Sequence, residues 1–440
     1  MTFIDPSFNN LKHVEVLDVI MGSGKTHAAL RHIESEALSG KSKWVYCTEF
    51  LSEIEIRTKE GDAKDKWCTP ESDDSSKLED FIDLLEEPDV SLIAITHQLF
   101  RQAMKQDDVI RLVASKGWNL YLDETFDCIN AYSGIRLSEF LWHKNAGRLS
   151  VDESNYGKVK WEDNTVFDYE TSDMSIFKLL KHQENVHAYV SGNQVSIVEI
   201  DNEVMFNVWN RMILSTYQFE GTLMEAYFRM KGIKWKECTD IVPSKITSKQ
   251  SIKEKVTMLH KYDKAFERLA LSSTWYEEKA LPEHFALINK TIRNIGDSNG
   301  CKGKPEKMGY TLPKSVLGKY RDKRKVQPAG YNHTVCLIDA DGKEIEGSVC
   351  KKRSGHIPCN ARASNEYAVK EVMVHIYDRY PNHVVANYLR GTNVSYSKER
   401  FAVNELVQWL WRSGIRDGKK ITVAILSKRM RELFLKWLND

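Results

Sequence analysis

The sequence predicts an α/β fold made of two tandem domains, each with a parallel sheet covered by helices on both faces. Short apolar runs at residues 14–20, 43–47, 91–96 and 119–122 alternate with segments of helical periodicity, as in parallel sheets that are buried on both sides. A glycine-rich turn joins the first run to the first helix. A similar alternation returns after residue 245, and a chain of 440 residues is long for a single core.

Composition restricts the class of protein. Hydrophobic residues make up 42% of the chain and charged residues 28%, which fits packed domains in water. No run approaches the roughly 18 apolar residues of a membrane span, and the first residues lack the features of a secretory signal. The eight cysteines are scattered without a CxxC pair, so we expect reduced thiols, no zinc site and a cytoplasmic location.

The first predicted domain spans residues 1–245. Its pattern loosens at 134–207, where we expect an insertion with a β-hairpin over Val186–Ile200, turning at Gly192-Asn193. This hairpin is a candidate strand-separating wedge, although such insertions more often cover an edge. The strand pattern returns at Arg211–Thr216.

The second predicted domain spans residues 246–440, with a basic and hairpin-containing insertion at 295–358. The segment from Lys302 to Lys325 contains nine basic residues and two acidic ones. Such a run is either a solvated linker or a segment that binds a nucleic-acid backbone. The remaining expected elements are strands at Arg268–Ser273, Phe285–Asn289 and Lys420–Leu426, a hairpin at Thr334–Gly347, and helices at Asn365–Arg379, Phe401–Arg412 and Arg429–Leu438.

A phosphate-binding loop is predicted at Val19–Thr26 (VIMGSGKT), between the first strand and the first helix. Glycines in this turn let consecutive N–H groups point at phosphate oxygens, and the helix adds the positive end of its dipole. The lysine would reach the β- and γ-phosphates, and the threonine hydroxyl would be a ligand of Mg²⁺. The residues predicted to bind the nucleotide are Gly22, Ser23, Gly24, Lys25 and Thr26.

Asp123 and Glu124 follow the apolar run at 119–122, about 100 residues after the lysine. A carboxylate at the end of a strand can hold Mg²⁺, and its neighbour can polarise the attacking water. We therefore predict that Asp123 lies on the metal side, together with Thr26, and that Glu124 is the general base.

Two later segments predict coupling of hydrolysis to movement. Ser215 and Thr216 end a strand and could hydrogen-bond the Asp-Glu pair, reporting the presence of the γ-phosphate. Gln408, Arg412 and Arg416 recur every four residues, which on a helix or its end places them on one face. An arginine there could stabilise the charge on the γ-phosphoryl group in the transition state. An amphipathic helix with solvated arginines is the alternative.

Taken together, these motifs resemble those of superfamily 2 helicases, particularly the compact DEx-box helicases of tailed bacteriophages. The resemblance runs from residue 14 to the end. Val19 stands where the loop motif has its first glycine, a departure that helicases tolerate, and Arg412 and Arg416 are four rather than three residues apart. The matching segments are Met21–Thr26 (motif I), Tyr46–Phe50 (Ia), Ile95–His97, Asp123–Thr125 (II), Ser215-Thr216 (III), Leu271–Trp275 (IV), Asn360–Tyr367 (V) and Gln408–Arg416 (VI).

This resemblance implies two tandem RecA-like P-loop domains with a nucleotide cleft between them. It also implies ATP and Mg²⁺ as cofactors and a nucleic-acid partner, with DNA favoured over RNA by the resemblance alone. Arg412 is favoured as the arginine finger by its register from Gln408, and Arg416 remains the alternative. Strand ends would contact the nucleic-acid backbone, and the candidates are Thr48, Thr96, His97, Arg362, Ser364 and Asn365.

Three other interpretations stay open at this point. A duplex translocase that does not unwind would carry the same motifs. A terminase-like packaging ATPase with a nuclease domain is suggested by Asp339 and Asp341 (LIDADG), but it leaves Gln408–Arg416 unexplained. A nucleotide-gated protein that binds a replication origin would turn over ATP slowly, without stimulation by nucleic acid.

Overall fold

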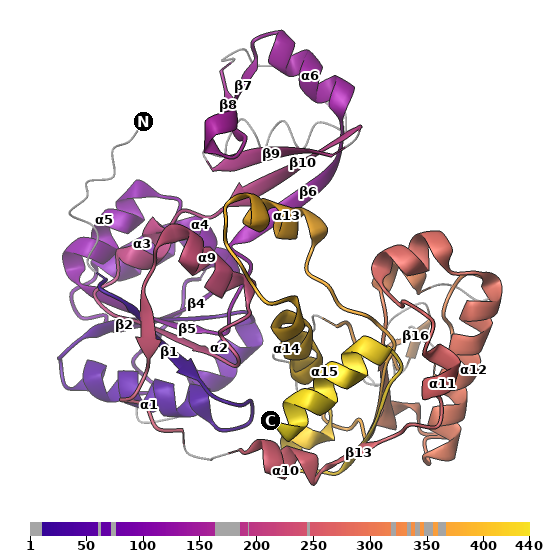
Figure 1. Ribbon diagram of the computed structural model, residues 1–440. Helices are drawn as coiled ribbons and strands as arrows, with labels where there is room; N and C mark the ends of the chain where they lie inside the picture. The colour runs from indigo at the N-terminus through magenta and orange to yellow at the C-terminus, as the bar shows by residue number, and fades with distance from the viewer. Residues whose placement is uncertain are drawn as a thin grey trace. The chain divides into compact units, whose positions relative to one another are not determined.

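The computed structural model describes residues 11–59, 63–71, 76–162, 185–191, 193–243, 247–317, 323–331, 336–338, 344–346, 355–359 and 367–440. The chain forms two compact units (Figure 1). Unit 1 comprises the described parts of Met1–Asp18, Thr26–Val242 and Pro381–Ser397, and unit 2 those of Val19–Lys25, Pro243–Tyr380 and Lys398–Asp440. The loop Val19–Lys25 thus groups with unit 2, whereas the residues on either side of it group with unit 1.

Unit 1 contains a parallel sheet of seven strands in the order β12-β1-β11-β5-β2-β4-β3. Every neighbouring pair in this sheet is parallel. Its elements are β1 (Val14–Asp18), α1 (Lys25–Leu38), β2 (Lys43–Thr48), α2 (Leu51–Arg57), β3 (Trp67–Cys68), α3 (Lys77–Glu86), β4 (Leu92–Thr96), α4 (His97–Ala103), α5 (Asp107–Lys116), β5 (Trp118–Asp123), α8 (Val204–Asn207), β11 (Met212–Thr216), α9 (Leu223–Lys231) and β12 (Trp235–Glu237).

The central strands of this sheet are apolar because they are covered on both sides. All residues of β5 and of β11 are buried, as expected for strands between two layers of helices. Local signals set the helix ends: Ser76 and Glu79 form a capping box at the start of α3, and Gly117 ends α5 at φ 66°. These signals set where α3 begins and where α5 ends.

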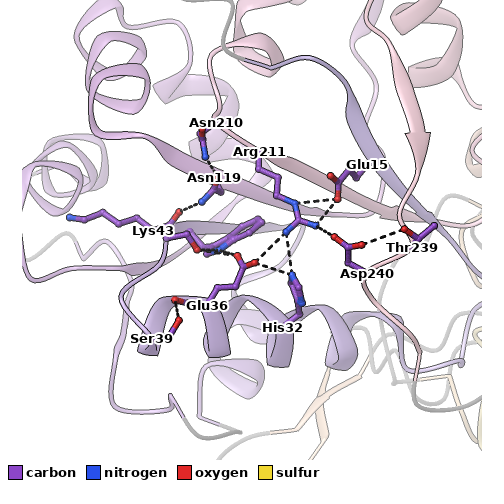
Figure 2. Close-up of polar contacts among 12 residues, drawn as sticks. Glu15, His32, Glu36, Ser39, Lys43, Asn119, Asn210, Arg211, Thr239 and Asp240 are labelled. Atoms are coloured by element: carbon purple, nitrogen blue, oxygen red, sulfur yellow. Dashed lines mark hydrogen bonds and ion pairs between the residues drawn. The ribbon is translucent and has the colours of Figure 1, made fainter.

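An ion-pair network at the amino edge of the sheet holds α1 in place (Figure 2). Arg211 directly precedes β11, and its Nη2 lies 2.7 Å from Glu15 Oε2 on β1. Its Nη1 lies 3.4 Å from Glu36 Oε1 on α1, and Asp240 Oδ2 accepts at 3.1 Å from Nη2. One guanidinium therefore links two strands, a helix and the segment after β12.

The predicted insertion is a second, antiparallel sheet within unit 1, in the order β6-β10-β9-β8-β7. The hairpin predicted over Val186–Ile200 is confirmed as β9 and β10. Helix α13 (His383–Gly391) comes from far along the chain and lies beside β6 and β10 (Figure 1). The elements are β6 (Ile129–Arg136), α6 (Leu137–Asn145), β7 (Leu149–Asp152), η2 (Glu153–Asn155), β8 (Lys158–Trp161), β9 (Val186–Ser191) and β10 (Gln194–Ile200).

Unit 2 contains a parallel sheet of four strands in the order β13-β18-β17-β14. The predicted α/β class, with a parallel sheet in each half of the chain, is confirmed. The elements are α10 (Lys249–Lys253), β13 (Val256–Met258), α11 (Asp263–Phe266), η4 (Trp275–Lys279), α12 (Pro282–Ser298), η5 (Pro305–Lys307), β14 (Met308–Thr311), η6 (Lys314–Val316), β15 (Cys336–Ile338), β16 (Glu344–Glu346), β17 (Val372–His375), α14 (Lys398–Leu410), η7 (Gly414–Asp417), β18 (Ile421–Ile425) and α15 (Lys428–Asn439).

Three predictions for unit 2 were wrong. Phe285–Asn289 is not a strand but part of α12, whose buried residues recur at helical spacing. Arg268–Ser273 forms no strand. The helix predicted over Asn365–Arg379 contains the strand β17, all four residues of which are buried. Short, fully apolar runs have no periodicity that separates a buried strand from a buried helix.

The other predicted elements of unit 2 are confirmed, namely the hairpin as β15 and β16, the last strand as β18 and the last two helices as α14 and α15. Among the described residues, no helix is both long and apolar enough to cross a bilayer.

Candidate nucleotide site

The predicted phosphate loop has the backbone of an anion cradle. Gly22 and Gly24 adopt φ values of 77° and 76°, a region that favours glycine, and α1 begins directly at Lys25. Ser23 is fully buried, and its Oγ accepts from the Thr247 amide at 3.4 Å. The start of a helix of 14 residues is therefore available to an anion in this loop, while the Ser23 amide donates to the Ile20 carbonyl at 3.3 Å.

Thr26 and Asp123 meet although they are far apart in sequence. The Thr26 hydroxyl lies 3.2 Å from Asp123 Oδ1 and 3.1 Å from Oδ2. The Tyr121 hydroxyl, on the same face of β5, donates to Oδ1 at 3.4 Å. Burial, and then the charge of Asp123, raises the pKa of Tyr121 well above its usual range, so this hydroxyl stays protonated and can donate. The site thus holds one carboxylate supported by two hydroxyl groups.

Glu124 has an unusual backbone conformation. Its φ is 72°, in the left-handed region that side-chain-bearing residues rarely adopt. The Glu124 amide donates to the Ser215 carbonyl at 2.8 Å, which fixes this turn at the end of β5. Strained residues held in this way cluster at functional sites. The structure therefore identifies Glu124 as a position where local strain is retained.

The predicted coupling strand β11 lies between β1 and β5, which carry the two halves of the site. In register, Ser215 is beside Asp123 of β5, and Thr216 is beside Asp18 of β1. Ser215 and Thr216 are fully buried, and the Thr216 hydroxyl has no hydrogen-bond partner in the described part of the chain. A buried donor of this kind is costly unless another group satisfies it.

Among the predicted nucleic-acid contacts, those in unit 1 lie at the carboxyl edge of the sheet. Thr48 and His97 are buried, and His97 Nε2 donates to the Asp123 carbonyl at 3.1 Å. Thr96 caps α4 by accepting from the Leu99 amide. Thr96 also lines a cavity of about 530 Å³ whose wall includes Phe50, Gln98 and Gln102. The nucleic-acid contacts of these three residues stay predictions.

The segment from Gln408 to Arg416 is not one continuous helix. Helix α14 ends at Leu410, Arg412 lies in the turn that follows, and Arg416 belongs to the short helix η7. Gln408 Nε2 donates to Asn404 Oδ1 at 2.9 Å. The three residues therefore do not share one helix, because α14 ends two residues before Arg412, and their common face at the helix end stays a prediction.

Sequence reasoning missed two residues here. Tyr121 could have been found, since in a strand it shares a face with Asp123. Trp411 has no such signal: its indole lies against Gly22 within unit 2, where a Cβ built on that glycine would be 2.9 Å from the ring.

Some predicted residues lie outside the described residues, namely Arg362, Ser364, Asn365, Asp339 and Asp341. Within the basic run 302–325, residues 318–322 are also outside them. Two described lysines of this run have partners inside unit 2: Lys307 pairs with Glu371 at 3.0 Å, and Lys325 donates to the Ser315 carbonyl.

The residues present fit a magnesium-bound nucleoside triphosphate. Mg²⁺ prefers oxygen ligands and is usually held by one or two protein groups together with phosphates and water. The Thr26 hydroxyl and the Asp123 carboxylate supply such oxygens within 3.2 Å of each other. Among the described residues, no cluster of three or more His, Cys, Asp or Glu side chains could hold a metal on its own.

Comparison with known proteins gives the following similarities. Over 454 residues the chain is 25% identical to the SPbeta prophage-derived uncharacterized protein YonV of Bacillus subtilis (strain 168), with 98% of this chain and 100% of that protein covered. Among solved structures, it is similar to one titled XPD_APO (TM-score 0.49, 13% identity, 98% of this chain and 96% of that chain). It is also similar to S. tokodaii Xpd4 (TM-score 0.44, 11% identity, 98% and 95% covered). Residues 245–438 match the YonV C-terminal Rossmann-like domain.

Proposed function

We propose that this chain is an ATP-driven nucleic-acid motor of the superfamily 2 helicase class, acting on DNA. The observation that carries the proposal is the strand order β1-β11-β5. It places the buried hydroxyl residues Ser215 and Thr216 between the phosphate loop after β1 and the Asp-Glu pair at the end of β5. A plain triphosphatase needs only the loop and the carboxylates, whereas a motor also needs a group that responds to both.

In this proposal the phosphate loop binds the triphosphate and Lys25 contacts its outer phosphates. Thr26 and Asp123 hold Mg²⁺, which when bound neutralises the negative charge that accumulates on the phosphate oxygens. Glu124 accepts a proton from the attacking water. Its left-handed backbone is the observation that supports this role, because the strain has a cost that catalysis would explain.

The proposed coupling runs through β11. Loss of the γ-phosphate changes what surrounds Asp123 and Glu124, and the Glu124 amide is bonded directly to β11 through the Ser215 carbonyl. The hydroxyl of the adjacent Thr216 has no hydrogen-bond partner in the described part of the chain. It can therefore form a new hydrogen bond when the groups around Asp123 and Glu124 change. We propose Arg412 as the arginine that stabilises the transition state, with Arg416 as the alternative and Gln408 as a further contact of this segment.

The proposed path of the nucleic acid crosses the carboxyl edge of the unit 1 sheet, past Thr48, Thr96 and His97. The cavity beside Thr96 supports this path because its wall combines apolar surface with the amide groups of Gln98 and Gln102. Bases have flat apolar faces and polar edges. Such a surface can pack against the faces and hydrogen-bond with the edges. His97 would act indirectly, through its bond to the Asp123 carbonyl.

The similarity to a prophage-derived protein supports a phage setting. We propose a role in replication, recombination or repair in the host cytoplasm. The test is strand displacement on forked DNA and on a matched RNA duplex, run beside triplex displacement, each with ATP and with a non-hydrolysable analogue. ATP-dependent displacement of a DNA strand is expected. Displacement of the triplex strand alone would make the chain a duplex translocase, and no ATP-dependent displacement of any kind would refute the motor.

A further inference from the structure

The indole of Trp411 packs directly on Gly22 of the phosphate loop, and both residues belong to unit 2. A Cβ built on Gly22 would lie 2.9 Å from Trp411 Cζ2 and 3.0 Å from Trp411 Nε1. Real Cβ atoms do not approach other atoms so closely, and φ at this residue is 77°. Glycine is therefore required here for two independent reasons, the backbone turn and the tryptophan ring that lies on it.

The N–H group of this indole is buried without a partner. Trp411 is 7% exposed, and its Nε1 has no hydrogen-bond partner in the described part of the chain. Trp409, two residues earlier, is also buried, but its Nε1 donates to the Ile357 carbonyl at 3.2 Å. Buried tryptophans usually have such an acceptor, and an unmet donor is costly. The position of Trp411 thus calls for an acceptor that the described part of the chain does not supply.

We infer that Trp411 is a nucleotide-binding residue whose indole N–H donates to the terminal phosphate of the bound triphosphate. The inference rests on the proposed triphosphate site. The unmet N–H lies at the phosphate loop, where an anion would supply the missing acceptor. Gly22 lies three residues before the start of α1. In phosphate loops the backbone N–H groups cradle the inner phosphates, so the terminal phosphate is the one left to accept from the indole. Hydrogen bonds to a charged phosphate are strong.

This contact makes the site sensitive to the phosphate state. A triphosphate accepts a hydrogen bond from the Trp411 N–H, whereas a diphosphate leaves this N–H without an acceptor. The chain therefore binds triphosphate more tightly than diphosphate by the free energy of this hydrogen bond. Trp411 also precedes Arg412 in the sequence. The presence of the terminal phosphate is therefore communicated to the segment that carries the proposed arginine finger.

The test compares Trp411→Phe with Trp409→Phe in the full chain. Phenylalanine keeps an aromatic ring over Gly22 and removes the N–H, and Trp409→Phe is the matched control because its N–H has a protein acceptor. Affinities for a non-hydrolysable ATP analogue and for ADP, both with Mg²⁺, are measured by calorimetry. Trp411→Phe is expected to weaken binding of the analogue by about tenfold or more and to leave ADP binding nearly unchanged.

Equal affinities of Trp411→Phe and wild type for both nucleotides would overturn the inference, as would an equal loss for both or tighter binding of either. If Trp411→Phe unfolds, benzothienylalanine at 411 replaces the N–H with sulfur at constant shape, and the same selective loss is expected. Measurements on the wild-type chain distinguish failure of the proposed motor from failure of the proposed Trp411 contact. Nucleotide binding without ATP-dependent strand displacement refutes the motor alone, whereas no nucleotide binding refutes the site and this inference together.

Discussion

The Thr26 hydroxyl lies 3.2 and 3.1 Å from the two carboxylate oxygens of Asp123, which joins the start of α1 to the end of β5. We propose this pair as the metal-binding part of the site, because both residue types are ligands that Mg²⁺ accepts. If it has this role, changes to the hydroxyl will alter nucleotide binding only when the metal is present.

Thr26→Val therefore tests the metal assignment, since valine keeps the shape of threonine and removes the hydroxyl. We expect the Mg²⁺-dependent part of triphosphate affinity to fall, while Thr26→Ser, which keeps the hydroxyl, stays near wild type. Titration of a fluorescent ATP analogue with and without Mg²⁺ measures this. Equal affinities of the two variants at saturating Mg²⁺ would remove Thr26 from the metal site.

Lys25→Ala is expected to abolish turnover and Glu124→Gln to lower it strongly, for different reasons. The first removes the cation that holds the outer phosphates, so nucleotide binding is lost. The second keeps the size of the side chain and removes the base, which lowers the rate by about 10²- to 10⁴-fold while nucleotide still binds. Phosphate release and nucleotide affinity, measured on the same preparations, separate the two. Retained ATPase activity in Glu124→Gln would overturn the general-base assignment.

Glu124→Gly is expected to make the protein more stable and inactive. The wild-type residue holds φ at 72°, which glycine adopts without the steric cost of a Cβ. Removing that cost should raise the free energy of unfolding of unit 1 by up to about 1 kcal/mol, as measured by urea denaturation. A less stable Glu124→Gly variant would show that the glutamate side chain contributes to the fold rather than storing strain for catalysis.

The two arginines after α14 should differ in their contribution to turnover. Arg412→Ala is expected to lower the rate of ATP hydrolysis by about a thousandfold, in the range of other arginine fingers, with a much smaller change in nucleotide affinity. Arg416→Ala is the matched control, four residues on in η7. A full effect at Arg416 and none at Arg412 would reverse the assignment, and no effect at either would remove this segment from the chemistry.

His375 predicts a pH dependence of the stability of unit 2. Burial, and then the charge of Arg379, lowers the pKa of His375 to about 3. Between that value and the ordinary pKa of 6.5, the unfolded chain binds a proton that the folded chain does not. Stability is therefore complete above pH 6.5 and falls as the pH is lowered, by about 1.4 kcal/mol per pH unit.

His375→Phe removes this pH-dependent contribution to stability and keeps an aromatic ring beside Trp409. The ring centroids of His375 and Trp409 are 5.3 Å apart. Urea denaturation at pH 7 and pH 5 should show a smaller loss of stability at pH 5 in the variant than in wild type. The same loss in both proteins would place the titrating group elsewhere.

The amount that the sequence could predict differed between the two units. The strands and loop around Lys25, Asp123 and Ser215 follow from apolar runs that end in polar residues, because parallel strands bring such ends to one edge. The error at Phe285–Asn289 arose because a short apolar run does not reveal its period. The return of Pro381–Ser397 to unit 1 depends on tertiary packing, with Val384 and Leu389 buried in that unit's core.

Long-range pairings were also beyond sequence reasoning. Nothing local indicates that Arg211 bridges Glu15, Glu36 and Asp240 (Figure 2), since these residues approach one another only after the sheet has formed. The contact of Trp411 with Gly22 has the same character. Sequence motifs could identify which residues have the chemistry, whereas the partners that orient them required the three-dimensional structure.

The most direct test of the motor is steady-state phosphate release by this chain with Mg²⁺ and ATP. The rate is measured without nucleic acid and with saturating single-stranded DNA, duplex DNA, forked DNA or RNA. We predict slow release without nucleic acid and several-fold faster release with DNA, both absent in Lys25→Ala. A rate that no nucleic acid changes would contradict the account, since the protein would then hydrolyse ATP without coupling it to a strand.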